Sequence, residues 1–235
     1  MLHARCLFVF AAVASMATGC ASSTVGLKPQ DVAHLKAVAE IPAVHGQPAA
    51  LRVIGPGKTL AGPMFGIVGA LIVEGLAVSD GKDLIKTYGL DDPALRVKER
   101  LVAALAERLA LNNVRAVATP VEDIDAKTLS GRFKDAVVLA VQTDEWTLRH
   151  LDISPYYGIA YGATARLVKT TDGTILSNAS CRLGGKNFAR LTMDELKADN
   201  GAQLKSRIEQ TADLCVEGLL FELVSRETVN AATSK

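Results

Sequence analysis

Hydrophobic and polar positions change period several times along the chain, and each change predicts a different element. Residues 136–141 are apolar without interruption, which is typical of a central strand covered on both faces. Alternation resumes over residues 146–150 and again over residues 159–167, which predicts long strands, the second of them half-exposed. An Asp-Gly pair within residues 171–174 predicts a hairpin turn. Residues 175–183 are then the returning strand.

Two segments show the 3.6-residue period of a helix. Asp92 can cap free amide groups, and the proline that follows it suits a first helical position. Leucines and valines from Leu95 to Leu109 then line a core face, with Lys98 among the charged residues placed outside. Residues 194–224 hold the last helix, with a break expected around Asn200-Gly201.

Shorter apolar runs predict the remaining strands. They lie within residues 31–44, 49–54 and 114–118, and residues 120–132 read as a polar connection with one helical turn. The order of elements predicts an α+β fold, in which a single mixed β-sheet is packed by two main helices.

A hydrophobic leader ends at Cys20. The apolar run from Cys6 to Val13 is too short to span a bilayer of about 30 Å. Small residues then lead to Thr18-Gly19-Cys20, which fit a lipoprotein cleavage box, although Ala17 stands where Leu is usual. Two interpretations stay open: a diacylglycerol lipid on Cys20, which we favour, or a plain secretory signal cut near Ala17 or Gly19.

The favoured interpretation divides the chain into four parts. Residues 1–19 are a signal peptide, 20–34 a lipidated tether, 35–225 a periplasmic α/β domain and 226–235 a flexible tail. Cleavage leaves 235 − 19 = 216 residues with 25 basic and 25 acidic side chains, because Arg5 leaves with the leader. A neutral chain argues against a nucleic-acid partner, because such binding rests on clustered Lys and Arg.

An apolar, glycine-rich insert spans Leu60 to Val78, with Glu74 its only charged residue. Three interpretations are open for it. It can be a buried hairpin or helix of the core, a loop that touches the membrane or a neighbouring subunit, or a transmembrane span. Pro63 and Glu74 count against the span.

Two cysteines remain after the leader and the lipidation site are set aside. Cys181 lies on one face of its predicted strand with Ile175, Ala179 and Leu183, and Cys215 lies on the apolar stripe of the last helix. Both sulfurs therefore point into one core, and in an oxidising periplasm a Cys181–Cys215 disulfide is favoured over two buried free thiols.

No catalytic constellation emerges from the sequence. Gly57-Lys58-Thr59 resembles the end of a phosphate-binding loop, but Arg52 stands where the first glycine is needed. The histidines that follow the leader have no His or Cys partner at metal-binding spacing. We therefore expect no catalytic residue, no metal, no cofactor and no enzymatic activity.

Aromatic residues concentrate in one region that can form a binding surface. Amphipathic rings beside charged groups dominate many interfaces. The alternative is that Trp146 and Tyr161 plug the edge of the core. The candidates are Trp146, Arg149, Tyr156, Tyr157 and Tyr161.

The Thr18-Gly19-Cys20 box resembles that of bacterial lipoproteins, and the absence of Asp at Ala21 implies sorting to the outer membrane. The element order over residues 35–225 is similar to the amino-terminal domain of TolB and to the curli secretion lipoprotein CsgG. We expect a non-enzymatic, lipid-anchored periplasmic protein that scaffolds or assists an envelope assembly, with an envelope protein or a second copy as partner. A small-ligand or glycan-binding, transporter-accessory role is the alternative.

Overall fold

The computed structural model describes residues 24–56, 74–151, 155–184 and 190–224. The predicted leader, the lipidation site Cys20, residues 60–73 of the apolar insert and the tail lie outside these described residues.

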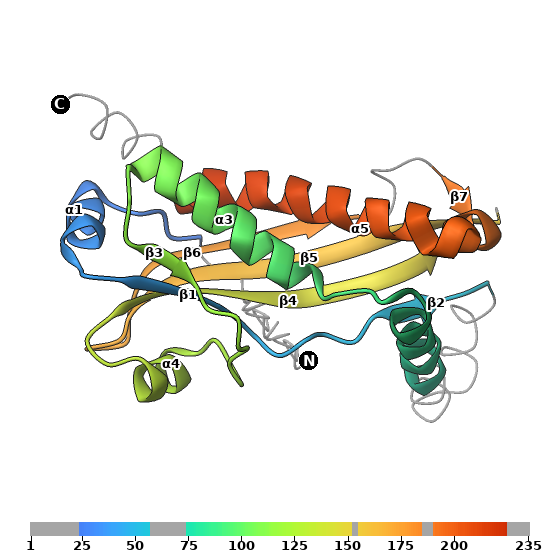
Figure 1. Ribbon diagram of the computed structural model, residues 1–235, viewed down its shortest axis with the longest axis horizontal. Helices are drawn as coiled ribbons and strands as arrows, with labels where there is room; N and C mark the ends of the chain where they lie inside the picture. The colour runs from blue at the N-terminus through green and yellow to red at the C-terminus, as the bar shows by residue number, and fades with distance from the viewer. Residues whose placement is uncertain (1–23, 57–73, 152–154, 185–189, 225–235) are drawn as a thin grey trace, which may run out of the picture.

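The fold is α+β and is built on a single mixed sheet, as predicted. The sheet has seven strands, and its main path runs β3-β1-β4-β5-β6. β1 pairs in parallel with β3 and β4, whereas β4, β5 and β6 form an antiparallel meander (Figure 1). The shorter β2 and β7 extend it beside β4 and β5. The bounds are β1 Ile41–His45, β2 Arg52–Ile54, β3 Val114–Ala116, β4 Val137–His150, β5 Tyr156–Lys169, β6 Thr174–Leu183 and β7 Leu191–Thr192.

The pairing of β4 with β5 contains a bulge that changes which side chains face the helices. The register shifts between Thr143 and Glu145, so Asp144 is the extra residue. Because a bulge places one additional residue on one strand, the alternation of faces is reset there. Thr143 and Trp146 are consequently both buried, although three positions separate them.

Two long helices cover one face of the sheet. α3 Pro93–Leu109 and α5 Met193–Leu223 lie side by side along it and enclose the main core (Figure 1). α5 is interrupted at residues 198–201, which confirms the predicted break. Gly201 has a φ of 72°, and a Cβ there would approach the Tyr88 ring to 2.7 Å, so glycine suits this position on both counts.

The opposite face is covered by α4 Ala126–Arg132, which lies at one end of the sheet (Figure 1). A second, smaller core lies beneath it, and all of its buried members are hydrocarbon side chains. They are Val44, Val121, Ile124, Leu129, Val138, Ala140 and Val168.

The amino-terminal part of the body differs from the prediction. Residues 24–34 are not a free tether: Val25 bridges Asn178 of β6, Leu27 is buried, and α1 Pro29–Ala37 packs into the core. A helix therefore occupies the first half of the segment that was predicted to hold a strand, and β1 begins at Ile41.

A helical stretch over residues 74–88 follows the part of the insert that is outside the description. Within the residues that the structure describes, no helix is both long enough and apolar enough to cross a bilayer.

A disulfide joins Cys181 of β6 to Cys215 of α5, with 5.5 Å between the two Cα atoms. The predicted inward face of β6 was wrong at one position, however. Ile175 is exposed, because the register between β5 and β6 shifts between Leu167 and Val168. Beyond the shift, Ser177, Ala179 and Cys181 point into the main core.

Candidate functional site

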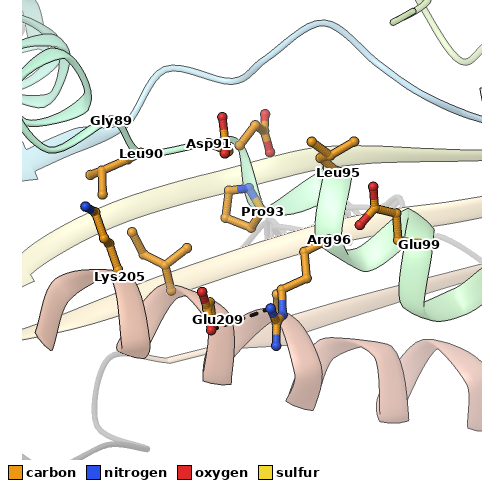
Figure 2. A pocket seen from close by; sticks show the side chains of 12 residues that line it. Gly89, Leu90, Asp91, Pro93, Leu95, Arg96, Glu99, Lys205 and Glu209 are labelled. Atoms are coloured by element: carbon orange, nitrogen blue, oxygen red, sulfur yellow. Dashed lines mark ion pairs between the residues drawn. The ribbon is translucent and has the colours of Figure 1, made fainter. Parts of the chain in front are cut away.

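A cleft of about 430 Å³ opens between the amino-terminal half of α3 and the middle of α5. Figure 2 shows Arg96 and Glu99 projecting from α3 and Lys205 and Glu209 projecting from α5, on opposite sides of the cleft. Its lining comprises Gly89, Leu90, Asp91, Asp92, Pro93, Leu95, Arg96, Glu99, Lys205, Ile208, Glu209 and Ala212.

Arg96 is fixed in the cleft by two acidic side chains of α5. Its guanidinium donates two hydrogen bonds to the carboxylate of Asp213, both 2.9 Å long, and lies 3.5 Å from Glu209. This bidentate contact raises the pKa of Arg96 and lowers the pKa of Asp213. The arginine is therefore fixed across the α3–α5 seam, with part of its surface still open to solvent.

Asp92 closes the base of the cleft and connects three segments. Its carboxylate caps α3 by accepting from the Ala94 amide at 2.8 Å, as the sequence predicted. It also accepts from the Ala49 amide at 2.6 Å and from the Thr143 hydroxyl at 2.5 Å. One side chain thus holds the start of α3, the approach to β2 and the middle of β4 together.

A buried hydrogen-bonded chain leads inward from Asp92. Thr143 donates its only hydroxyl proton to Asp92, so the Tyr161 hydroxyl, 3.2 Å away, is left to donate to Thr143. Tyr161 is fully buried, and desolvation raises the pKa of its hydroxyl strongly. The tyrosine is held neutral, and its role in this chain is to donate.

A second hollow of about 410 Å³ lies beside Tyr157. Burial, with a contribution from the charge of Asp80, raises the pKa of Tyr157. The hollow combines apolar residues with a few charged ones: Val53, Gly55, Pro56, Asp80, Asp83, Leu84, Tyr157, Met193 and Lys197.

The predicted aromatic surface does not exist as one surface. Trp146 is only 2% exposed and Tyr161 is buried, so both belong to the core, as the alternative interpretation held. Arg149 lies on the other face of β4 and pairs with Glu145 at 2.8 Å. Tyr156 is half-buried opposite Thr192 of β7. Of the five candidates, only Tyr157 lines the second hollow.

Two basic side chains, His45 and Lys98, meet inside the protein, although the sequence analysis placed Lys98 on an exposed face. Lys98 is 1% exposed; its ammonium donates to the Val117 carbonyl at 2.7 Å, and its Nζ lies 3.2 Å from Nδ1 of His45. Burial lowers the pKa of Lys98, and burial together with the nearby ammonium lowers the pKa of His45. His45 is thereby held neutral as an acceptor.

The chemistry available at these places is that of binding and positioning. The cleft offers fixed opposite charges, and the polar chain beneath it is satisfied internally. Among the described residues, no group of three or more His, Cys, Asp or Glu side chains is placed to hold a metal ion. Sequence reasoning found the Asp92 cap but missed its links to Ala49 and Thr143.

Among the comparisons with known proteins, only the solved structures include chains similar to this one. No protein-family model matches the sequence. No curated protein matches it either.

Solved structures similar to this chain include a PelC dodecamer from Paraburkholderia phytofirmans, at 12% identity and a TM-score of 0.34 over 87% of this chain and 95% of that one. A neuraminyllactose-binding hemagglutinin homolog from Helicobacter pylori gives 11% identity and a TM-score of 0.33 over 82% and 87%. A lipoprotein from Neisseria meningitidis gives 15% identity and 0.25 over 74% and 99%. Likeness this distant does not indicate the activity of this chain, and the predicted resemblance to TolB and CsgG stays a prediction.

Proposed function

We propose that this chain is a non-enzymatic, lipid-anchored protein of the bacterial envelope, facing the periplasm from the outer membrane, that scaffolds or assists an envelope assembly. The lipid is placed on Cys20. An envelope protein or further copies of the chain are the expected partners.

The observation that carries this proposal is how the segment next to Cys20 is built into the body. The Val25 amide donates to the Asn178 carbonyl at 2.9 Å, and the Asn178 amide donates back to Val25 at 2.9 Å. The Leu27 amide donates to the Leu223 carbonyl at 2.9 Å. A body fixed this firmly to its anchoring segment suits a protein that holds others at a membrane.

The disulfide supports the same placement. Cys181 and Cys215 are joined where β6 meets α5, and structural disulfides persist in oxidising compartments such as the periplasm. A secreted chain with a disulfide and a cysteine at its predicted cleavage site fits a lipoprotein better than a cytoplasmic protein.

The test is mass spectrometry of the protein extracted from membranes, together with crosslinking in intact cells. We expect a mature chain starting at Cys20 with added acyl mass, the disulfide intact, and a crosslinked partner. A Cys20→Ser variant should lose the acyl mass and leave the membrane fraction, whereas a Ser22→Ala control should keep both. A mature chain without lipid, or an unpartnered monomer under all crosslinkers, would contradict the proposal.

A second candidate function is the binding of a small ligand or glycan, and the hollow at Tyr157 favours it. Tyr157 and Lys197 face the same space, so one ring and one cation are available to a ligand there. Ligand screening by thermal shift tests it: a hit should be lost in Tyr157→Ala and kept in Tyr156→Ala. A hit that survives Tyr157→Ala would place the ligand elsewhere.

A further inference from the structure

Exposed hydrophobic side chains gather on the segments that surround the first described residues. Phe221 of α5 is 63% exposed, and Leu214 lies seven positions before it, on the same side of the helix. Val25, which lies beside β6, is also exposed. We call these three residues the apolar corner: Val25, Leu214 and Phe221.

Hydrogen bonds tie the segments of the apolar corner to one another. The Ser177 hydroxyl lies 2.7 Å from the Val25 carbonyl and 3.2 Å from the Leu223 carbonyl, so β6, the amino-terminal segment and the end of α5 meet at one serine. The Glu222 carboxylate accepts from the Ser180 amide at 3.1 Å and the Thr24 hydroxyl at 3.5 Å. The disulfide joins the same strand and helix a few residues further on. The corner is therefore a fixed part of the body.

The segment between Cys20 and Val25 is short, and its length limits the distance between the apolar corner and the lipid. Val25 follows Cys20 by five residues. At about 3.5 Å per residue, the Cα of Val25 lies within about 18 Å of the Cα of Cys20. Thioether-linked acyl chains on Cys20 would therefore keep Val25 close to the headgroups, without a tether long enough to release the body.

We propose that the apolar corner rests on the bilayer surface and orients the body relative to the membrane. This inference rests on the proposed lipidation of Cys20 and adds which face of the folded body meets the lipid. Glu217 lies on the exposed side of α5 between Leu214 and Phe221. The contact is therefore interfacial, with rings and aliphatic groups at the headgroup boundary and the carboxylate in water.

The chain provides its own matched comparison. Leu76 is also an exposed hydrophobic residue, 51% accessible, but it lies at the end of the apolar insert, in the helical stretch 74–88. If the insert touches the membrane instead, Leu76 and not Phe221 will be near lipid. Trp146, the only tryptophan, is 2% exposed and gives the same fluorescence background in every variant.

The experiment uses full-length, lipidated Phe221→Trp and Leu76→Trp proteins in phosphatidylethanolamine–phosphatidylglycerol vesicles, with plain or brominated acyl chains. Side chains of interfacial helices lie about 5–10 Å inside the boundary, so brominated lipid should quench about half of the added signal of Phe221→Trp. The added signal of Leu76→Trp should be the same with plain and with brominated lipid. Both variants replace exposed residues, so we expect both to fold. The disulfide mass and circular dichroism check this.

Quenching of Phe221→Trp alone supports the inference. Quenching of Leu76→Trp alone, of both equally, or of neither overturns it. Shielding of Phe221→Trp without quenching, together with a crosslinked homodimer, also overturns it and assigns the corner to a second copy. The acyl mass on Cys20 is measured on the same samples, so a lipidated protein with unquenched Phe221→Trp refutes only the orientation. A protein without lipid refutes the proposed anchoring, and the orientation falls with it.

Discussion

The two faces of the sheet are covered in different ways. α3 and α5 extend along one face and enclose a core that also contains polar side chains, among them His45, Lys98 and Thr143. α4 covers one end of the other face, above seven buried residues that are all hydrocarbon. The long strands β4 and β5 run through both environments.

This difference shows what the helices add. Under α4 the strands need only apolar contacts, and beyond it the same face of β4 and β5 carries exposed groups, such as Asp144 with Thr164 and Glu145 with Arg149. Under α3 the buried polar groups connect helix to sheet through Asp92 and Lys98. The helical face is therefore where both the stability and the pH response of the fold should concentrate.

The largest effect should come from a matched pair of leucines, one under each cover. Leu101 of α3 and Leu129 of α4 are both fully buried. We expect Leu101→Ala to lower the free energy of unfolding by about 4–5 kcal/mol and Leu129→Ala by about 2–3 kcal/mol, because the small cluster near the surface can collapse into the space. Urea denaturation at equal protein concentration measures both. Equal losses would mean that the two cores are packed with the same rigidity.

The next largest effect tests the covalent link on the helical face. Cys181 and Cys215 are 34 residues apart in sequence, and a loop of that length predicts about 3–4 kcal/mol of stabilisation. A Cys181→Ala/Cys215→Ala protein should therefore unfold at a lower midpoint concentration of urea. Adding reductant should lower the midpoint of the parent protein to nearly the same value. A double variant as stable as the parent would show that non-covalent packing alone holds α5 on β6.

The strand order of the meander and the two main helices could be predicted because their signals are local. Asp-Gly at a turn, an uninterrupted apolar run and an Asp-Pro helix start each need only a few neighbouring residues. α1 was missed because it buries only Val32 and Leu35, which leaves a weak period, although Pro29 and Asp31 in its first turn suit a helix start. Whether residues 24–34 form a tether or part of the body depends on contacts with β6 and α5, far away in sequence.

The candidate site was less predictable, for two physical reasons. The contact of Asp92 with Thr143 spans 51 positions, and no local pattern in the sequence signals a contact between residues so far apart. Lys98 was assigned to an exposed face by its charge. Its spacing from Ala94, Leu101 and Leu105 puts it on the buried side, however, and that spacing was the better guide.

A smaller effect should separate the caps of the two covering helices. Asp92 caps α3 and also binds Ala49 and Thr143, whereas Asp125 caps α4 through the nearby Lys127 and Thr128. We expect Asp92→Ala to lower the free energy of unfolding by about 2–3 kcal/mol, because it removes a cap and leaves buried donors without an acceptor. Asp125→Ala should have a clearly smaller effect in the same denaturation series. The reverse order would show that the long-range contacts of Asp92 add nothing to its cap.

The smallest effect is a pH dependence confined to the helical face. Burial and the Lys98 ammonium lower the pKa of His45 below the ordinary imidazole value of 6.5. The unfolded chain therefore binds a proton more readily than the folded one, so the contribution of His45 is complete above pH 6.5 and is lost as pH falls towards the folded pKa. Stability should drop over this window, and the drop should be shallower in His45→Gln.

Hydrogen exchange followed between pH 7 and pH 5 can place that change within the molecule. After correction for the intrinsic exchange rate, protection should fall first for the amides of α3, whose Lys98 contacts His45. It should fall later for the amides of α4, which covers hydrocarbon alone. His34→Asn replaces an exposed histidine on α1 and serves as the control, with the parent profile expected. If α3 and α4 lose protection together, acid unfolds the sheet as one unit, and the buried His45–Lys98 pair does not give the helical face a response of its own.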